Sequence, residues 1–403
     1  MESTPRAQPG YGRDMTLFTD DMRRNPYPLY AGLRQGGASV MPMEHLGLTM
    51  VLDYEGVKRT LSDAEAFSSD LTPVRGQTFE WLPFLDSPRH TQLRALVSRA
   101  FTSRSIAALE GRIRELSQAL ADQLLAAPSG EVDLTADFAQ RLPMLVIADL
   151  IGLPHEDWRK LADWSQTIVN LGNTVSGDGA AEAEQAAAVA QVEATAYFEA
   201  HAAERRRAPR EDLLTRLVQA EIDGQGLTER ELFHFFELLL VAGSETTTNL
   251  ISNAIICLAE HPAELARLRA APDLLPSAIE EVLRYRTPVQ AMFRVARKDV
   301  ELGGCTIPAG RFVLPMIGAA NRDAAQFAAP DRFDIGRAPN PHLAFGHGIH
   351  FCLGAQLARL EGKIALADLL ARMQTFELAT STWTPRTPFH IHGPSAMPIR
   401  YTR

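Results

Sequence analysis

One cysteine in this sequence stands in a pattern with specific chemistry. Cys352 is preceded by a glycine-containing loop, Phe345 to Phe351, and followed by Leu353, Gly354 and a run of helix-forming residues. Glycines let a loop turn sharply and let its backbone approach a flat ligand. The free N–H groups and positive end of a helix lower the pKa of a thiol and favour the thiolate. The segment is therefore typical of a thiolate that binds a metal, such as the iron of a haem.

Three other interpretations of this loop are possible. Gly346-x-Gly348 also occurs in dinucleotide-binding loops, but a third glycine is out of register and no alternation of strands and helices surrounds it. A catalytic nucleophile at Cys352 would need a cysteine-hydrolase signature, which the sequence lacks. A lone cysteine is usually an inert buried residue, but the glycines and aromatic residues around this one argue against that interpretation.

A second group of residues that could do chemistry lies inside a long predicted helix, Thr228 to Glu260. This helix begins with a capping box and would be about 50 Å long. Its interior holds the run Ala242 to Thr248, which contains a glycine, several hydroxyl groups and one acid. This composition predicts a bulge or kink near Gly243. The alternative is an irregularity that faces solvent.

These motifs resemble those of bacterial cytochromes P450 over nearly the full length. The loop before Cys352 matches the family's Phe-x-x-Gly-x-His/Arg-x-Cys-x-Gly signature, and Ala242 to Thr247 matches its oxygen-activation motif. Glu281 to Arg284 matches Glu-x-x-Arg, and Pro330 to Phe333 stands where the family has Pro-x-Arg-Phe. The resemblance implies a mainly α fold with a minor β part, in which residues 1–403 form one prism-shaped domain around a long central helix.

The resemblance implies haem b as cofactor, O2 as co-substrate and a monooxygenase reaction that inserts oxygen into a C–H bond. Cys352 would bind the iron, Thr246 would act in oxygen activation, and Glu245 would relay protons. His90 and Arg94 share a helical face and would bind a haem propionate, because a guanidinium suits a carboxylate. The other residues expected at the haem are Arg294, His350, Phe345, Gly346, Gly354 and Ala242. Both histidines also fit as ordinary core or surface residues.

Glu281 and Arg284 are one helical turn apart and can pair. With Arg332 they would form a structural charge network, although a Glu-x-x-Arg pair is often only a solvated ion pair.

The residues expected to line the substrate pocket are mostly apolar. They predict a hydrophobic substrate of moderate size, such as a steroid, terpenoid or fatty acid. A polyketide or other natural-product intermediate, a different oxidation at the same site and a haem sensor without turnover are the alternatives. The pocket residues are Phe79, Trp81, Leu82, Phe84, Leu239, Val289, Met292, Phe293 and Ile391.

Electrons would come from NAD(P)H through an external ferredoxin or flavodoxin and its reductase, since the sequence contains no flavin or iron–sulfur motif. The resemblance also implies that this reaction is driven by electrons and not by peroxide, because family members that use peroxide alone have an arginine where this sequence has Glu245 and Thr246. A basic cluster is either a docking patch for an acidic partner or a solvated helix face; it comprises Arg89, Arg99, Arg104 and Arg112.

The net charge of −9 argues against a nucleic-acid partner, and three scattered cysteines favour a reducing, cytoplasmic setting. No apolar run reaches the roughly 20 residues that span a bilayer, so we expect no membrane anchor. We also expect a monomer.

The elements that must position these residues are mainly helices. Helical patterns cover Ser105–Leu125, Pro143–Ile151, Ala180–Arg207, Thr228–Glu260, Leu275–Arg286 and Leu353–Arg372. Met50–Leu52 is a predicted strand, and Val300–Leu302 with Arg311–Pro315 predict a small sheet.

Overall fold

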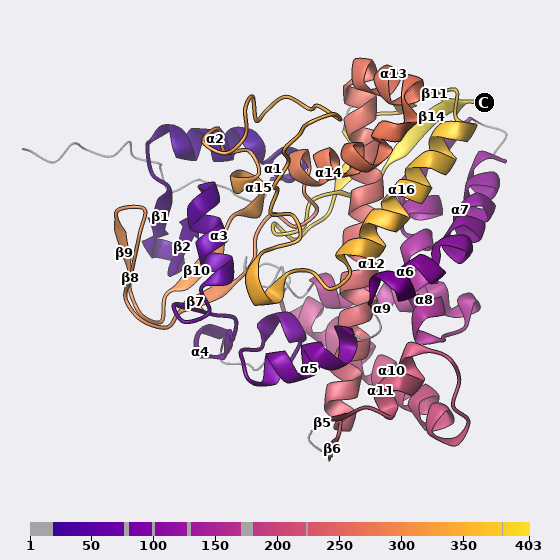
Figure 1. Cartoon of the computed structure of the whole chain (residues 1–403), viewed down its shortest axis with the longest axis horizontal. Helices are drawn as coiled ribbons and strands as arrows, with labels where there is room; N and C mark the ends of the chain where they lie inside the picture. The colour runs from indigo at the N-terminus through magenta and orange to yellow at the C-terminus, as the bar shows by residue number, and fades with distance from the viewer. Residues whose placement is uncertain are drawn as a thin grey trace, which may run out of the picture.

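A computed structural model describes residues 19–75, 80–98, 101–126, 130–170, 180–222, 225–380 and 382–403. These residues form a mainly helical fold with a minor β part, as predicted; the strands of the largest sheet lie at the left of Figure 1, and β11 and β14 lie at the upper right. The helices are α1 (Asp20–Arg24), α2 (Tyr27–Gln35), α3 (Tyr54–Ser62), α4 (Thr72–Arg75), α5 (Arg89–Ser98), α6 (Ser103–Ala108), α7 (Glu110–Leu125), α8 (Arg141–Ile151), α9 (Trp158–Asn170), α10 (Ala180–Arg207), α11 (Leu213–Val218), α12 (Glu229–Glu260), α13 (Pro262–Ala270), α14 (Leu275–Tyr285), α15 (Ile317–Ala320) and α16 (Ala355–Arg372).

The β part is divided among several small sheets. The largest has five strands in the order β1-β2-β10-β7-β3, in which β10 runs parallel to β2 and the other pairs are antiparallel. The strands are β1 (Val40–Met43), β2 (Leu48–Val51), β3 (Phe67–Ser68), β4 (Glu131–Asp133), β5 (Glu221–Ile222), β6 (Gln225–Gly226), β7 (Arg294–Ala296), β8 (Val300–Leu302), β9 (Cys305–Ile307), β10 (Phe312–Pro315), β11 (Thr375–Leu378), β12 (Thr384–Pro385), β13 (Pro394–Ala396) and β14 (Pro398–Thr402).

The long helix α12 runs through the helical part of the fold (Figure 1). Thr228 caps its first turn by accepting from the main-chain N–H of Glu231, whose side chain accepts in return from Thr228. The first half of α12 packs with α8, α9 and α10 in one hydrophobic cluster. Its second half packs with α7, α14 and α16 in another. Side chains on α12 therefore face several elements that are distant in sequence.

Most predicted elements are confirmed, with two corrections. The predicted helix Ser105–Leu125 is divided into α6 and α7 at Leu109. The predicted small sheet is wrong, because β8 pairs with β9 whereas β10 lies between β2 and β7. β-pairing between distant segments leaves no local pattern in the sequence.

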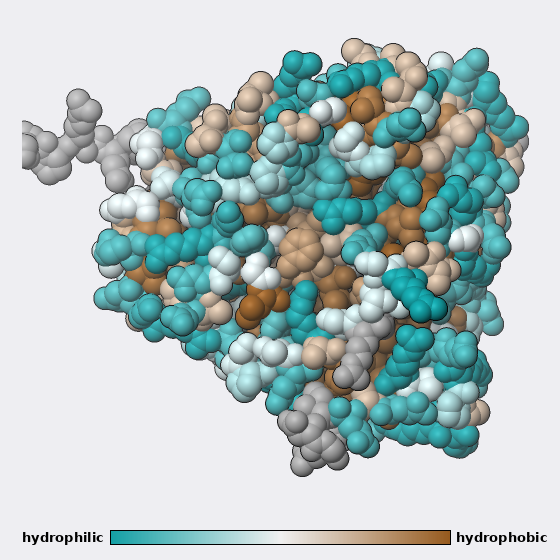
Figure 2. All heavy atoms as spheres, viewed as in Figure 1, coloured by the Kyte–Doolittle hydropathy of each residue, from teal (hydrophilic) through white to brown (hydrophobic). Residues whose placement is uncertain are grey.

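The surface of the protein is mostly polar. The face seen in Figure 2 is mainly hydrophilic, with hydrophobic side chains gathered in recesses near its middle. Across the ranges given above, no helix is both long enough and apolar enough to cross a membrane.

Candidate active site

The loop before Cys352 is folded tightly and lies against α3. The main-chain N–H of Cys352 donates to the carbonyl of Phe345 at 2.9 Å, which closes the loop. Gly346 and Gly348 have φ of 73° and 75°, a region that disfavours other residues. A Cβ on Gly348 would also lie 2.8 Å from the α-carbon of Ser62, at the end of α3. Both glycines of the predicted motif are therefore needed for the shape of the loop.

Cys352 lies deep within the fold, and its side chain is nevertheless exposed rather than packed. Burial raises the pKa of its thiol, while a hydrogen bond from the N–H of Gly354 and the charges of Arg94 and Arg359 lower it. Burial has the larger effect, and the hydrogen bond from Gly354 acts in the lowering direction predicted for the N–H groups beside the cysteine. α16 begins at Ala355, and Gly354 is its N-cap residue.

Positively charged and polar side chains from three segments converge near this loop. The rings of His90, on α5, and His350 lie 4.1 Å apart, and Ser69 bonds to Nε2 of His350 at 2.9 Å. Arg294, at the start of β7, is buried and donates to the carbonyl of Phe293. Arg94 donates to the carbonyl of Phe351.

These groups lack anionic partners that would balance their charge. Within the described residues, no carboxylate lies within ion-pair distance of Arg94 or Arg294, and neither ring nitrogen of His90 has a hydrogen-bond partner. Burial lowers the pKa of Arg294 to about 10, although Asp86 opposes this. Burial, followed by Arg294, His90 and Arg94, lowers the pKa of His350 to about 3. A buried cluster of this kind fits a ligand with carboxylates, and the two propionates of haem b meet that requirement.

The middle of α12 presents Thr246 and Glu245 to different surroundings. Thr246 is half-buried, and its hydroxyl donates to the carbonyl of Ala242 at 2.9 Å. Ala242 itself is exposed, although it lies in the middle of a helix. Glu245 is buried and its carboxylate lies 3.0 Å from Nη1 of Arg386. Ala242 and Thr246 therefore share an accessible face, whereas Glu245 faces the protein interior.

Gly243 does not interrupt α12, so the bulge that was predicted there is not present. The helix is continuous from Glu229 to Glu260. The hydroxyls of Ser244 and Thr248 donate to main-chain carbonyls one turn earlier and remain within the helix. A Cβ on Gly243 would lie 2.4 Å from Cδ1 of Ile147, on α8. The glycine thus serves close packing between α12 and α8.

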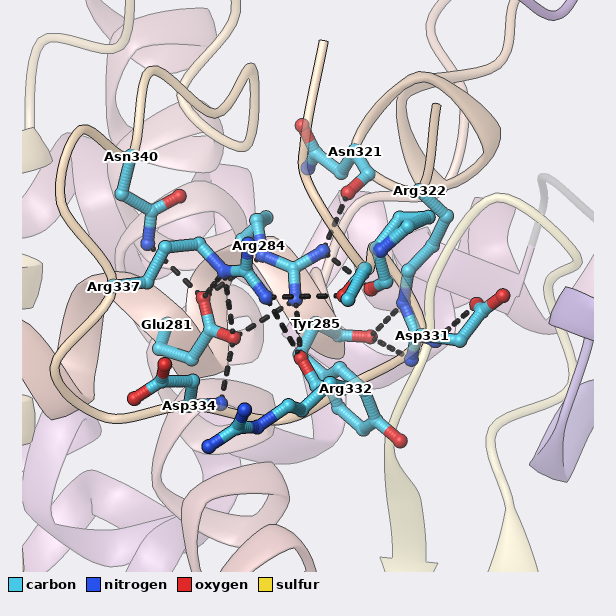
Figure 3. Close-up of polar contacts among 12 residues, drawn as sticks. Glu281, Arg284, Tyr285, Asn321, Arg322, Asp331, Arg332, Asp334, Arg337 and Asn340 are labelled. Atoms are coloured by element: carbon cyan, nitrogen blue, oxygen red, sulfur yellow. Dashed lines mark hydrogen bonds and ion pairs between the residues drawn. The ribbon is translucent and has the colours of Figure 1, made fainter. Parts of the chain in front are cut away.

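Glu281 and Arg284 form the centre of a buried polar network (Figure 3). Nε and Nη2 of Arg284 each donate to the Glu281 carboxylate at 2.8 Å. Arg284 also donates to the carbonyls of Asn321, Pro330 and Arg332. Because these carbonyls belong to the chain leading to the cysteine loop, the network braces that chain against α14.

The guanidinium that completes this network belongs to Arg337 and not, as predicted, to Arg332. Arg337 Nε donates to Glu281 at 3.1 and 3.2 Å, while Arg332 is exposed and contributes its carbonyl (Figure 3). The main-chain N–H of Asp334 and the amide of Asn340 also donate to Glu281. Sequence reasoning missed Arg337 because it lies 56 residues from Glu281 with no local pattern to connect them.

The predicted pocket residues fall into separate groups. Leu82 and Leu239 belong to the same hydrophobic cluster, and Phe84 lies beside Leu82 in a short 3-10 helix. Val289 forms a β-bridge with Ile391.

The remaining pocket residues have other surroundings. Met292 packs against the cluster that includes β10 and α3, whereas Phe293 stacks on Phe312 with ring centroids 5.8 Å apart. Trp81 donates from its indole N–H to Glu237, a buried acid that sequence reasoning missed. Phe79 lies outside the described residues.

Two of the four arginines in the predicted basic cluster form ion pairs. Arg89 pairs with Glu231, and Arg112 pairs with Asp149 at 2.8 Å. Arg104 is exposed on α6, and Arg99 lies outside the described residues.

Comparison with known proteins shows to which family the chain belongs. The family model described as cytochrome P450 matches residues 40–273 and 269–390. The chain belongs to the cytochrome P450 family. A similar solved structure is that of CYP109E1 from Bacillus megaterium in complex with testosterone, which is 40% identical, has a TM-score of 0.89, and aligns over 96% of this chain and 100% of that one.

Curated relatives cover similar shares of both chains. Cytochrome P450 109 of Bacillus spizizenii is 40% identical over 96% of this chain and 94% of its own length. The monooxygenase PikC of Streptomyces venezuelae is 40% identical over 97% of this chain and 94% of its own. This P450 is accordingly a monooxygenase that uses haem b, O2 and electrons supplied from NAD(P)H through redox partners.

Proposed function

We propose that Cys352 supplies the thiolate ligand of the haem iron and that the cluster near it binds the propionates. The cluster consists of His90, Arg94, Arg294 and His350; Arg294 is buried with its charge unpaired among the described residues, and both ring nitrogens of His90 lack hydrogen-bond partners there. Phe345, Gly346 and Gly354 would contact the haem from the cysteine loop, and Ala242 from α12. The accessible positions of Cys352 and Ala242 support this arrangement.

We propose that the chain hydroxylates a hydrophobic substrate of moderate size. Bound haem would supply the activation of O2 and the oxidation of a C–H bond. Thr246 would donate a hydrogen bond from the accessible face of α12, and Glu245 would carry protons toward it. The buried carboxyl of Glu245, adjacent in sequence to Thr246, is the observation that favours these two roles.

A steroid, terpenoid or fatty acid is the substrate class that we favour. The proposed pocket residues Leu82, Leu239, Val289, Met292 and Ile391 present apolar side chains, which suits such molecules. Relatives support the same classes: the similar CYP109E1 was solved with testosterone, and a 38% identical relative from Mycobacterium bovis is a methyl-branched lipid omega-hydroxylase.

A natural-product intermediate is the second candidate. A relative from Saccharopolyspora erythraea, 41% identical, is an erythromycin C-12 hydroxylase, and PikC is a further relative. For electron supply we propose a ferredoxin or flavodoxin with its reductase. We also propose that the chain acts in the cytoplasm as a monomer with residues 1–403 in one domain.

The experiment that tests this function is a titration of the purified ferric protein with steroids, terpenoids, fatty acids and macrolides. Displacement of water from the iron by a substrate converts the haem from low spin to high spin and shifts the Soret band to shorter wavelength. We expect this shift with at least one of the first three classes, and oxygen insertion into that compound on turnover. A shift confined to macrolides would support the second candidate, and a protein that takes up no haem would contradict the function itself.

A further inference from the structure

Glu245 has a charged partner that no sequence motif marks. Arg386 Nη1 lies 3.0 Å from Oε2 of Glu245, and both side chains are 3% exposed. The two residues come from α12 and from the segment that follows β12 near the end of the chain. Two opposite charges at this depth depend on each other, because removing either leaves the other buried without compensation.

Arg386 is held rigidly in the position from which it reaches Glu245. Its main-chain N–H donates to the carbonyl of Gly393 at 2.9 Å, across the hairpin formed by β12 and β13. Its guanidinium also donates to the side chain of Gln166, on α9. Gly393 in turn packs directly against Asn249, one turn after Glu245 on α12, since a Cβ there would lie 2.3 Å from Oδ1 of Asn249. The hairpin is thereby fixed to the same face of α12 that carries Glu245.

Two effects act on the charge of the Glu245 carboxyl: its burial and the nearby Arg386. Burial raises the pKa of Glu245, and among the described residues Arg386 is the charged group that lowers it. The other side chain that the Arg386 guanidinium contacts, Gln166 on α9, is neutral. Without Arg386, desolvation alone would act on the carboxyl and favour its protonated form.

We propose that Arg386 is a positioning residue for proton transfer, which turns the carboxyl of Glu245 toward the C-terminal hairpin and favours its ionised form. A carboxyl that is always protonated cannot accept the next proton, and one that moves freely cannot return to the same position after each transfer. Arg386 thus keeps the acid able both to take up and to release a proton. This inference rests on the proposed role of Glu245 as the proton relay.

The pair itself can be tested without turnover, by infrared spectroscopy of the ferric, substrate-free enzyme as a function of pH. The carbonyl stretch of a protonated buried carboxyl is isolated by subtracting the spectrum of the matching variant with Glu245→Gln. We expect Arg386→Met to move the appearance of this band upward by about one pH unit or more. Arg386→Lys keeps the positive charge and is expected to leave the band near its wild-type midpoint.

Two outcomes would overturn the inference. One is a band whose midpoint is the same in Arg386→Met and in the wild type. The other is an equal upward shift in Arg386→Lys and Arg386→Met, which would mean that packing and not charge matters. Should Arg386→Met fold poorly, Arg386→Gln provides the same loss of charge with a polar side chain.

Turnover then separates this inference from the proposed function. With a substrate that gives the spin shift, Arg386→Met is expected to raise severalfold the share of reductant lost to hydrogen peroxide, and Arg386→Lys is expected to restore most of the coupling. The control is Arg205→Met, which breaks another buried ion pair, with Asp212 at 2.6 Å, away from this site. If Glu245→Gln itself leaves coupling unchanged while the band still shifts in Arg386→Met, the ion pair stands and the relay role of Glu245 fails. If Glu245→Gln uncouples the enzyme and the band does not shift, the relay stands and the role of Arg386 fails.

Discussion

Arg337 donates from Nε to both carboxylate oxygens of Glu281, at 3.2 and 3.1 Å, and so takes the position in the buried network that the sequence motif suggested for Arg332. The side chain of Arg337 is 10% exposed and Glu281 is fully buried. Charge-assisted hydrogen bonds in such surroundings are among the strongest in proteins. The difference between these two arginines provides a direct test of the network.

We expect Arg337→Ala to lower the free energy of unfolding by about 1–3 kcal/mol, because Glu281 loses a buried charged donor. Arg332→Ala should change it by no more than about 0.5 kcal/mol, since its exposed side chain is not part of the network and its carbonyl is retained. Urea unfolding of the haem-bound variants measures both values. Equal losses in the two variants would show that the side chain of Arg332 also takes part.

Gly243→Ala is expected to destabilise the protein despite the better helix propensity of alanine. The added methyl group would lie 2.4 and 2.7 Å from side-chain carbons of Ile147, and overpacking of this kind costs about 1–3 kcal/mol. Ile147→Val removes the nearer carbon and should make the double variant less unstable than the sum of the single effects. A double-mutant cycle by thermal unfolding measures this coupling, and strict additivity would contradict the close contact.

Arg294→Met is expected to speed the loss of haem while leaving the haem-free protein at least as stable as the wild type. Burial lowers the pKa of this guanidinium to about 10, so its charge is a burden unless an anion is bound. Transfer of haem to an acceptor protein measures the first effect, and urea unfolding of the haem-free protein measures the second. Arg311→Met is the control, because Arg311 pairs with Glu44 on the edge of the same sheet. Haem retention at the wild-type level in Arg294→Met would contradict a propionate-binding role.

Thr246→Ala is expected to uncouple the enzyme, so that reductant is still consumed but much of it yields hydrogen peroxide. The hydroxyl bonds only to the carbonyl of Ala242 among the described residues, so its loss should have little effect on folding. Thr248→Ala removes an equivalent hydroxyl from the buried face of α12 and should keep the wild-type coupling. The measurement is the ratio of product and peroxide to NAD(P)H consumed, and an unchanged ratio in Thr246→Ala would exclude the role proposed for its hydroxyl.

Glu280 should make stability depend on pH in the acid range. Burial raises the pKa of Glu280, but hydrogen bonds from Arg359 and His342 outweigh burial and lower it to about 2. A carboxyl with a lowered pKa in the folded state stabilises the protein fully above its unfolded value of 4.5, and this contribution is lost as the pH falls toward 2. We expect Glu280→Gln to remove up to about 3 kcal/mol of this dependence. Unfolding by urea at pH values from 3 to 7 measures it, with exposed Glu377→Gln as the control.

The sequence by itself determined the parts of this protein that depend on neighbouring residues. The capping box at Thr228 and Glu231 marked the start of α12 correctly, because capping is a contact within one helical turn. The loop before Cys352 carried its own pattern of glycines, and the pair Glu281 and Arg284 followed from helical spacing.

Tertiary structure alone decided which distant groups meet. Arg337 replaces Arg332 beside Glu281, and Arg386 pairs with Glu245, because chain segments far apart in sequence are brought together by packing. Gly243 was misinterpreted for the same reason: its lack of a side chain makes room for Ile147 on α8 rather than breaking its own helix. The pKa of Cys352 also depends on burial more than on the helix end beside it. Local patterns encode hydrogen bonds and turns, whereas burial and long-range ion pairs exist only once the chain has folded.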